Sequence, residues 1–475
     1  MSHTQDLSTY AICVDLDGTL IKTDSLHESL LALFKKNPFN LVKCIFWLFT
    51  GKAGFKARVA KHVTVNSMSL PYNQELIKFL NDEYTDNRKY LCTAENERID
   101  QDVADNVGMI QQVYASKDRY RLKGDNKAKL LTEKFGKKQF IYAGNDYSDL
   151  KIWDKSAGAI VVSDSQKLIG KVKLVTDIIA HFKSGTNSMK KYLAAIRLHQ
   201  WVKNLLMVIP MILAHKVMEI DGYINIAIAF VSFGLVASGT YVVNDLMDLD
   251  ADRAHKTKRN RPFASGALSV LTGIVMAPLL ILSGIGIAYL VSTDFLVFVL
   301  IYLVVTLIYT YVVKTIAILD VIILAMLYTI RLMAGAVAIE VEITFWLLAY
   351  SMFIFFSLAN VKRYTEIARL DDTHEISGRG YNRDDANFIR VLGVASGLLS
   401  VLVFALYIND PGISMKYTHP AWLWAITPLL LYWVTRIWHL AHHGKMIEDP
   451  VVFAIRDVVS YLIAGLVGFG IFMAI

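Results

Sequence analysis

Cysteine is scarce in this chain of 475 residues: only Cys13, Cys44 and Cys92 are present, all within the first hundred positions. They form no CxxC pair, and three thiols cannot all pair with one another. This excludes a disulfide framework and favours a reduced, cytosolic environment. The N-terminal sequence also lacks a basic region followed by an apolar stretch, so we expect no signal peptide.

Charge is sparse in much of the second half. Up to about Lys190 the chain mixes charged and apolar residues as a soluble domain does, and beyond it long apolar runs alternate with short charged loops. Because the chain is too long for one ordinary core, we expect a soluble domain over 1–182, a linker over 183–190 and a membrane domain over 191–475. The formal net charge is +7, and no nucleic-acid partner is expected.

Nine stretches in the second half are apolar enough to cross a membrane, which takes about 20 residues. Lys and Arg gather in the loops 244–267 and 361–388, whereas the opposite loops hold only Lys216 and Lys416. The positive-inside rule then predicts a multi-pass protein of the inner (cytoplasmic) membrane, with the N-terminus in the cytosol and the C-terminus outside. The predicted spans are 192–214, 222–243, 268–290, 294–313, 316–337, 343–360, 389–407, 421–440 and 451–475.

A row of carboxylates follows the second predicted span. Asp245, Asp248 and Asp252 recur at spacings of three and four, which stacks them on one face of a helix. Such crowding costs stability unless a cation lies among the carboxylates, and hard oxygen ligands suit Mg²⁺, which also bridges to substrate phosphates. A basic run follows at once and could hold phosphate oxygens. Its members are Arg253, Lys256, Lys258, Arg259 and Arg261.

The segment NDLMDLDAD and the basic run after it resemble the first aspartate-rich motif of the UbiA-type prenyltransferase superfamily. The resemblance covers about 190–475 and implies an all-α membrane domain of nine transmembrane helices. It also implies a Mg²⁺–diphosphate site on the cytosolic side, with Asp245 and Asp248 as catalytic residues and Asp252 as a further metal ligand. The candidates for a second aspartate-rich motif are Asp320, Asp384 and Asp385, with Asp449, Arg456 and Asp457 as secondary candidates.

The segment RLHQWVKN in the first predicted span is similar to the RxxQWxKN signature of the branch that includes decaprenyl-phosphate phosphoribosyltransferase. This resemblance implies transfer of 5-phosphoribose from phosphoribosyl diphosphate to polyprenyl phosphate, a membrane lipid. Ionisable groups inside a span usually face a polar cavity, and two substrates rich in phosphate need several cations. The residues expected to hold the substrates are Arg197, Lys203, Asn204, Asn244, Arg253, Lys258, Arg261, Lys314, Asp320, Arg331, Lys362 and Arg363.

Two alternative functions stay open. The same metal site would serve a prenyltransferase that moves a prenyl group from prenyl diphosphate to an aromatic or other small acceptor, beside a phosphatase of unrelated substrate. The membrane domain could also be a non-catalytic lipid-binding scaffold with a regulatory soluble domain. Each intramembrane cation could instead snorkel or form an interhelical ion pair, and Lys362 and Arg363 could be ordinary positive-inside residues.

Apolar runs in the first half end in polar signatures. AICV runs into DLDGTL, which contains Asp15 and Asp17; KYLC ends at Thr93; and QFIYAG leads into GNDYSDL. Strands that carry polar residues at their carboxyl ends are typical of an open α/β sheet with its site at that edge.

The segment DLDGTL resembles the first motif of the haloacid dehalogenase-like superfamily, and Thr93, Lys127 and GNDYSDL fit the other three motifs in order over about 8–180. The resemblance implies an α/β Rossmann-like haloacid dehalogenase fold. It implies that Asp15 attacks phosphorus, that Asp17 acts as acid and base, and that Thr93 and Lys127 hold the phosphoryl group. A second Mg²⁺ is expected on Asp15, Asp17 and Asp149, with Asn145 or Asp146 completing its shell.

About 75 residues separate Asp17 from Thr93, which predicts a helical cap at about 24–86. Within it, NPFNLVKCIFWLFTGKAGFK is either a core helix or a helix that contacts the membrane or a lipid. The adjacency of two such domains suggests consecutive steps, in which the soluble domain removes the 5-phosphate from the product of the membrane domain. Tethering would raise the local concentration of the second site.

Overall fold

The computed structural model describes residues 10–37, 39–49, 51–116, 122–185, 188–216, 218–369, 380–411, 417–446 and 449–475. The chain divides into two compact units. The first comprises Met1–Ala195 and Val242–Met276, and the second comprises Ile196–Tyr241 and Ala277–Ile475. The segment 242–276 therefore packs with the N-terminal residues, although its neighbours in the sequence belong to the second unit.

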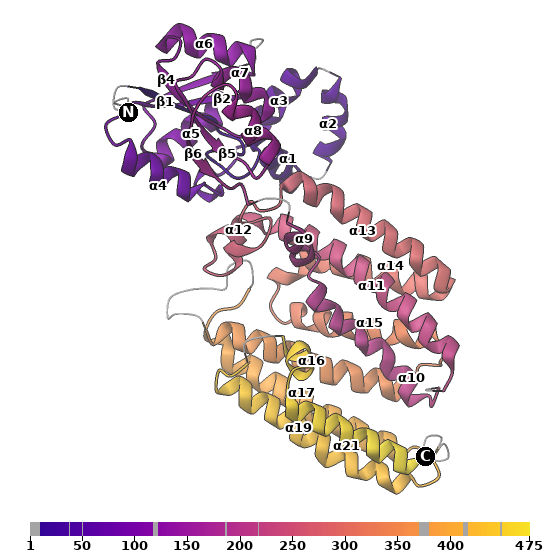
Figure 1. The fold of residues 1–475 in the computed structure, drawn as a ribbon. Helices are drawn as coiled ribbons and strands as arrows, with labels where there is room; N and C mark the ends of the chain where they lie inside the picture. Colours follow the sequence, from indigo (N-terminus) through magenta and orange to yellow (C-terminus); the bar gives the residue numbers. More distant parts are fainter. Residues whose placement is uncertain are drawn as a thin grey trace. The chain divides into compact units, whose positions relative to one another are not determined.

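A six-stranded parallel sheet forms the centre of the first unit (Figure 1). The spatial order is β3-β2-β1-β4-β5-β6, so the chain moves outward from β1 on one side and resumes at β4 on the other. Such a reversal leaves a crevice outside the carboxyl ends of β1 and β4, where ligands bind in open α/β sheets. The strands are β1 Ala11–Val14, β2 Lys89–Asn96, β3 Gln112–Ser116, β4 Phe140–Gly144, β5 Gly158–Val162 and β6 Ile178–Phe182.

Both faces of this sheet are buried, which explains the continuous apolar runs of its strands. Along β1, Ile12 and Val14 belong to one hydrophobic cluster, while Cys13 between them belongs to another. Successive side chains of a strand point to opposite faces, so the two clusters lie on the two sides of the sheet. Leu76 packs into the first cluster and Trp153 into the second.

Helices connect the strands of the first unit, and four of them lie between β1 and β2, where the sequence predicts a cap. The first begins after Asp24, whose carboxylate accepts hydrogen bonds from the N–H groups of Leu26 and His27. The helices are α1 Ser25–Lys36, α2 Asn40–Leu48, α3 Gly51–His62, α4 Gln74–Glu83, α5 Glu97–Val107, α6 Asp125–Phe135, α7 Leu150–Trp153, α8 Gln166–Lys173, α9 Met189–Ala195 and α12 Leu249–Ala254.

The apolar stretch predicted at residues 37–56 contains helix α2 and is partly buried. Cys44 joins a small core with Leu33 and Phe55. In contrast, the side chains of Phe46 and Phe49 are 67% and 85% exposed. Residues 38 and 50 of this stretch lie outside the described residues. Helix α2 therefore combines a packed face with exposed aromatic side chains.

The second unit is built from helices. The long ones are α11 Ile220–Met247, α13 Val270–Val291, α14 Thr293–Tyr311, α15 Leu319–Ala338, α16 Phe345–Ile367 and α17 Asp385–Ile408, of which α11 and α13 each extend into the first unit. Shorter helices are α10 Ile209–Leu213, α19 Ile426–His442, α20 Pro450–Ala454 and α21 Val458–Ala474, with 3-10 turns η4 Leu198–Val208 and η7 Pro420–Ala425.

The structure corrects the prediction of nine spans. Within the described residues, six helices are long and apolar enough to cross a membrane. The first predicted span is divided among α9, η4 and α10, because Arg197 adopts a positive φ of 49° and interrupts the helix. The last two contain helices of only 17 residues, since η7 precedes α19 and Asp457 caps the start of α21. About 20 residues are needed to span the bilayer core.

The fold predicted for the N-terminal part, a haloacid dehalogenase fold, is also corrected. The structure has a small parallel-sheet region there, and this region does not establish that fold. The physical reason is that a parallel sheet with crossover helices is common to many doubly wound proteins. Short motifs at strand ends predict the sheet edge but do not distinguish among these folds.

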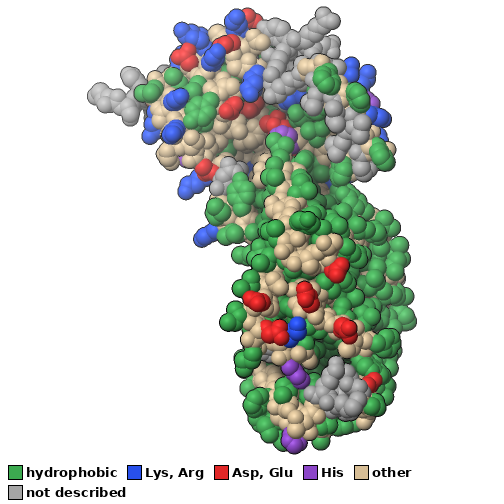
Figure 2. Space-filling view, turned by 90° about the vertical axis from the view of Figure 1, so that its right-hand side faces the viewer, with side chains coloured by type: hydrophobic (Ala, Val, Ile, Leu, Met, Phe, Trp, Pro, Cys, Tyr) green, Lys and Arg blue, Asp and Glu red, His purple; other side chains and the backbone are tan. Residues whose placement is uncertain are grey.

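The six long helices differ in how far the protein itself buries them. In α15, 67% of the most apolar window is buried, whereas in α13 the value is 17%. Helix α15 is therefore a central helix, and α13 presents most of its apolar surface outward. We call the first unit the sheet unit and the second the helical unit. Figure 2 shows hydrophobic side chains covering much of the visible surface of the helical unit, while Lys, Arg, Asp and Glu are spread over the sheet unit. Such an apolar exterior is typical of a multi-pass membrane protein.

Candidate functional site

The carboxyl ends of β1 and β4 bring the first group of predicted site residues together. Asp15 directly follows β1, and its Oδ1 accepts a hydrogen bond from Nζ of Lys127 at 2.7 Å. Lys127 also donates to the carbonyl of Cys92 at 2.9 Å, one residue before the buried Thr93. Burial alone would lower the pKa of Lys127, but the nearby carboxylates of Asp15 and Asp149 outweigh it and raise that pKa.

Asp17 lies beside the start of α1. Its Oδ1 accepts from the backbone N–H of Ser25 at 2.8 Å and its Oδ2 accepts from the Ser25 hydroxyl at 3.2 Å. Burial, reinforced by the charges of Asp24 and Asp15, raises the pKa of Asp17 to about 7. A carboxyl with this pKa can both donate and accept a proton near neutral pH.

Asp149 is the buried acid of the GNDYSDL segment. Its Oδ2 accepts from the N–H groups of Asn145 and Asp146, both at 3.0 Å, and its Oδ1 accepts from the hydroxyl of Tyr142 at 3.3 Å. Burial and the charge of Asp15 raise its pKa to about 6. The side chain of Asp146 instead accepts from Tyr147 N–H, so it caps the following turn.

Asp100 on α5 is a buried acid that the sequence analysis did not single out. Its side chain is fully buried, and neither carboxylate oxygen has a hydrogen-bond partner. Burial, followed by the charges of Asp17 and Asp15, raises its pKa well above the usual range for an aspartate. No short motif surrounds Asp100, and only the fold brings it near the other two.

The aspartate-rich segment lies at the end of α11 and in α12. Nη1 of Arg261 donates to Oδ1 of Asp245 at 3.1 Å and to Oδ2 of Asp252 at 2.6 Å, and both carboxylates are buried. Asp248 lies between them in the sequence, at the N-cap of α12. The guanidinium of Arg261 therefore joins two of the three carboxylates that the spacing predicts as Mg²⁺ ligands.

No three His, Cys, Asp or Glu side chains of the described residues are grouped closely enough to hold a metal by themselves. This does not conflict with a Mg²⁺ site, because Mg²⁺ is commonly held by one or two carboxylates together with waters and substrate phosphates. The oxygen pair of Asp245 and Asp252 meets that requirement.

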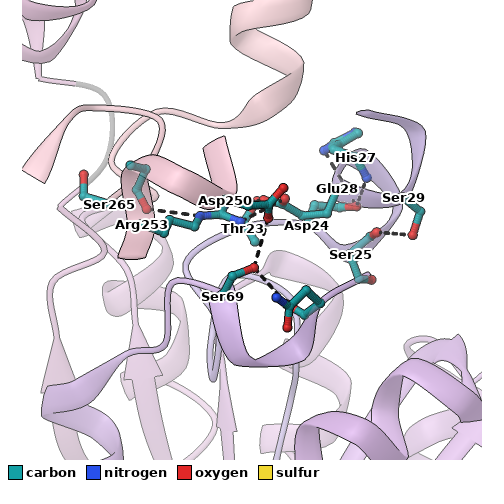
Figure 3. Close-up of polar contacts among 12 residues, drawn as sticks. Thr23, Asp24, Ser25, His27, Glu28, Ser29, Ser69, Asp250, Arg253 and Ser265 are labelled. Atoms are coloured by element: carbon teal, nitrogen blue, oxygen red, sulfur yellow. Dashed lines mark hydrogen bonds and ion pairs between the residues drawn. The ribbon is translucent and has the colours of Figure 1, made fainter. Parts of the chain in front are cut away.

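Arg253, predicted to hold phosphate, lies in an ion pair within the first unit (Figure 3). Its Nη2 and Nη1 donate to Oε1 and Oε2 of Glu28 at 2.6 and 3.1 Å, and both side chains are only 5% exposed. On the same segment, Asp250 accepts from Lys35 and Ser69, each at 3.0 Å. Glu28 carries no sequence signal, since it is one acid in an amphipathic helix.

A second polar group lies in the helical unit around Asp449. Its carboxylate accepts from Nζ of Lys203 at 2.8 Å, from the hydroxyl of Tyr328 at 3.1 Å, and from Nζ of Lys362 at 3.5 Å. Asp449 and Lys203 are both buried. The structure thus brings together two predicted cations and a secondary candidate, and it adds Tyr328, which no spacing indicated.

Arg331 lies in α15, and its side chain is buried. It donates to the side chain of Asn204 at 3.3 Å, to the hydroxyl of Tyr302 at 2.8 Å and to the carbonyl of Leu327 at 2.6 Å. The amide nitrogen of Asn204 has no hydrogen-bond partner although it is buried. These side chains therefore include a donor that an oxygen-rich ligand would satisfy.

Asp320 and Arg363, also predicted to bind substrate, lie together in a different part of the helical unit. Arg363 forms ion pairs with both Asp320 and Glu366, and Asp320 also accepts from Tyr381. Both Asp320 and Arg363 are fully buried. This arrangement is that of a structural ion pair, which the sequence analysis kept as the alternative.

The other predicted site residues lie on separate elements of the structure. Arg197 lies with its guanidinium 5.1 Å from the ring centroid of Tyr241, and Lys314 lies in the turn Val313–Thr315. Lys258 lies in an exposed turn, and Asn244 lies in α11 before Asp245. Of the further acidic candidates, Asp384 is the N-cap of α17 and Asp457 pairs with Arg436 at 2.7 Å.

An apolar cavity of about 700 Å³ lies within the helical unit. Its lining includes Val202, next to Lys203, and Val451, two residues after Asp449. The remaining wall is mostly aliphatic and aromatic, with Leu358, Trp433 and Phe404 among its members. An apolar cavity of this size suits the apolar chain of a lipid, and sequence neighbours of Lys203 and Asp449 form part of its wall.

The sequence profile of the UbiA prenyltransferase family matches residues 205–456, more than half of the chain. The chain therefore belongs to the UbiA prenyltransferase family, a family of membrane enzymes. The match lies C-terminal to the sheet of the first unit, and the comparisons give no evidence of a haloacid dehalogenase domain.

Individual proteins resemble this chain over different shares of its length. A Sinorhizobium fredii protein, uncharacterized protein y4nM, is 35% identical over 468 residues, which cover 98% of this chain and 90% of that protein. Nodulation protein NoeC of Azorhizobium caulinodans is 34% identical over 56% of this chain and 87% of its own. Decaprenyl-phosphate phosphoribosyltransferase of Mycolicibacterium smegmatis is 30% identical over 46% of this chain and 71% of its own. The similarity to y4nM thus includes the N-terminal sheet as well as the helices.

Proposed function

We propose that the UbiA-family part of the chain transfers 5-phosphoribose from phosphoribosyl diphosphate to polyprenyl phosphate, and that the site at the edge of the N-terminal sheet then removes the 5-phosphate from the lipid product. The observation that carries the first part is the apolar cavity lined by sequence neighbours of Lys203 and Asp449. A polyprenyl phosphate has the same division, with an apolar chain and an anionic head. The chain would lie in the cavity and the phosphate against Lys203 and Lys362.

The donor would bind at the aspartate-rich segment. Asp245 and Asp252 offer two buried carboxylates joined by one guanidinium, and a Mg²⁺ held there would neutralise the diphosphate and stabilise its departure. An oxygen of the lipid phosphate attacks the anomeric carbon, the bond from that carbon to the diphosphate breaks, and diphosphate leaves with the electron pair. Arg261 would move from the carboxylates to the diphosphate oxygens as the donor binds.

Two observations favour phosphoribose over a prenyl group as the moiety transferred. The RLHQWVKN segment resembles the signature of the phosphoribosyltransferase branch, and four of the signature residues, Gln200, Trp201, Lys203 and Asn204, lie on η4. The relatives named decaprenyl-phosphate phosphoribosyltransferase are 28–32% identical to this chain over 45–57% of its length. Transfer of a prenyl group to an aromatic acceptor is the competing reaction within the same family.

The phosphatase part of the proposal rests on the edge of the sheet. Asp15 would attack phosphorus and form an aspartyl-phosphate, and the alcohol would leave with a proton from Asp17. Water activated by Asp17 would then release phosphate. Lys127, 2.7 Å from Asp15, and Thr93 would hold the phosphoryl oxygens, and a second Mg²⁺ would be held near Asp15 and Asp149.

We further propose that both sites face the cytosol at a bacterial inner membrane. Because successive spans alternate in direction, the linkers 248–269, 312–318 and 368–384 lie on the same side. These linkers hold most of the Lys and Arg between spans, and the positive-inside rule assigns such a side to the cytosol.

The test uses purified full-length protein in detergent with Mg²⁺, radiolabelled phosphoribosyl diphosphate and a polyprenyl phosphate. The wild type and Asp15→Asn are compared by chromatography of the lipids. We expect label in the lipid for both proteins, with the variant accumulating the more negatively charged product. Asp245→Asn should lower label transfer at least 100-fold, since one of two metal-binding carboxylates is lost.

Three outcomes would contradict parts of the proposal. Failure to label the lipid, together with reaction of a prenyl diphosphate and a small aromatic acceptor, would replace it with the prenyltransferase function. Failure of both reactions would favour a lipid-binding scaffold. Identical lipid products from wild type and Asp15→Asn would contradict the proposed phosphatase step and leave the transferase step unaffected.

A further inference from the structure

The helix that carries part of the aspartate-rich segment is held by a residue from the N-terminal part of the chain. Arg253 on α12 makes two parallel hydrogen bonds to Glu28 on α1, at 2.6 and 3.1 Å. Its Nε also donates to the carbonyl of Ala264 at 3.3 Å. One buried guanidinium therefore joins α1, α12 and the end of the loop that follows α12 (Figure 3).

Contacts other than the one with Arg253 also hold Glu28 in place. The hydroxyl of Thr23 donates to its Oε1 at 2.8 Å, and α1 is anchored at its first residue by the two hydrogen bonds from Ser25 to Asp17. The side chain of Glu28 is only 5% exposed. A carboxylate that is already held in this way loses little further conformational freedom when it binds a guanidinium, so the contact between Glu28 and Arg253 is rigid.

The pair is adjacent to the proposed metal ligands. Arg253 follows Asp252 directly in α12, and Asp252 shares Arg261 with Asp245. A shift of α12 would separate the oxygens of Asp252 and Asp245, because only Asp245 lies on the preceding helix α11. The position of α12 thus determines whether the two carboxylates can act on one cation.

We propose that Glu28 is a positioning residue for the transferase site: through Arg253, it holds α12 so that Asp252 and Asp245 converge on one cation. This inference rests on the proposed function of that site. It means that a residue of the N-terminal part of the chain, outside the UbiA-family match, contributes to the transferase reaction. A buried pair is suited to this role, since loss of either partner leaves an uncompensated charge that must find water.

The experiment compares full-length wild type, Glu28→Gln, Arg253→Gln and the double variant in detergent. The matched control is Glu75→Gln, which makes the same change of glutamate to glutamine at an exposed side chain on α4. Two quantities are measured: the Mg²⁺ dependence of phosphoribosyl transfer, and hydrogen–deuterium exchange of the amides in 248–268 without substrate.

We expect Glu28→Gln and Arg253→Gln each to lower the transfer rate about 10-fold and to raise the Mg²⁺ concentration at half-maximal rate at least threefold. The double variant should be no worse than either single variant, because both remove the same interaction. Amides of 248–268 should exchange at least fivefold faster in Glu28→Gln than in wild type. Glu75→Gln should stay within twofold of wild type in both measurements.

Unchanged Mg²⁺ dependence and exchange in Glu28→Gln would overturn the proposal, and so would additive losses in the double variant. If Glu28→Gln does not fold, Glu28→Asp provides the second test, since its shorter side chain keeps the charge but cannot make both hydrogen bonds. If the wild type itself transfers no phosphoribose, the proposed function fails. Exchange in 248–268 and Mn²⁺ binding followed by electron paramagnetic resonance then still decide whether Glu28 positions the carboxylates.

Discussion

Buried charges in this protein are arranged in pairs and small groups whose members come from distant parts of the chain. Asp15 lies against Lys127, Glu28 against Arg253, and Asp449 against Lys203. An isolated buried carboxylate costs several kcal/mol, so each of these contacts constrains which substitutions the fold accepts. Asp100 is different, because its carboxylate is buried without a hydrogen-bond partner and its pKa is raised instead.

Lys127 gives a direct test of the phosphatase site. Lys127→Met should lower the rate of phosphate release from a phosphoribosyl lipid about 100- to 1,000-fold, because Lys127 supplies positive charge beside Asp15 and the transferring group. Phosphate release is measured with a colorimetric assay. Lys129→Met is the matched control, since Lys129 lies on the same helix α6 with its side chain exposed. Equal rates in both variants would show that Lys127 takes no part in phosphate release.

Arg261 allows the metal site to be tested without turnover. Arg261→Gln leaves the buried carboxylates of Asp245 and Asp252 without their cation, so in the presence of a chelator the melting temperature should fall by about 5 °C. Added Mg²⁺ should restore much of this loss, because it can take the place of the guanidinium. The measurement is thermal unfolding in detergent followed by tryptophan fluorescence. A loss of stability that Mg²⁺ does not reverse would argue against a cation between these carboxylates.

At the scale of elements, the helical unit depends on close contacts made at small residues. Gly335 of α15 lies against the backbone of Met207 in η4: a Cβ there would be 2.3 Å from the carbonyl oxygen of Met207. This contact lets η4, which carries Lys203 and Asn204, approach the helix that carries Arg331. Small residues commonly permit such approach between helices in membranes.

We therefore expect Gly335→Ala to destabilise the helical unit by about 2 kcal/mol, because backbone atoms rather than a flexible side chain would have to move. The melting temperature in detergent, read by size-exclusion chromatography after heating, provides the measurement. Gly286→Ala is the control, since its added methyl group meets no atom within 4 Å. It should be neutral or slightly stabilising, as alanine usually is in a helix. A similar effect of both substitutions would contradict the role assigned to Gly335.

At the scale of the whole molecule, the two units are interleaved in sequence rather than joined by a single linker. Residues 242–276 belong to the first unit, and the chain enters and leaves them through the membrane helices α11 and α13. The expected linker at 183–190 lies within the first unit, and the chain instead changes unit after Ala195, Tyr241 and Met276. Residues 186 and 187 of that expected linker lie outside the described residues. A cut at 183–190 would leave the aspartate-rich segment on the C-terminal fragment without Glu28.

Labelling of introduced cysteines tests the orientation of the chain. The three native cysteines are buried, so they give little background. A membrane-impermeant maleimide should label Glu340→Cys, in the turn after α15, in intact cells. Lys258→Cys, in the turn after α12, should be labelled at least tenfold more strongly after lysis than before it. The reverse pattern would place the aspartate-rich segment outside the cytosol.

The sequence by itself determined the features that depend on local pattern. Runs of apolar residues predicted membrane-spanning helices in the second half, and strand ends predicted a parallel sheet with Asp15 and Thr93 at one edge. The three-and-four spacing predicted that Asp245, Asp248 and Asp252 hold Mg²⁺, which stays a prediction, and in the structure Asp245 and Asp252 share the guanidinium of Arg261. These features follow from side-chain periodicity and strand direction, which are properties of neighbouring residues.

Only the tertiary structure decided the rest. It reduced nine predicted spans to six, because breaks at Arg197 and before α19 and α21 depend on backbone geometry rather than on hydropathy. It also paired Glu28 with Arg253 across more than two hundred residues and gathered Lys203, Tyr328 and Asp449. A pair between distant residues leaves no periodic trace in the sequence, since its energy depends on where the fold brings the two side chains and on how completely water is excluded there.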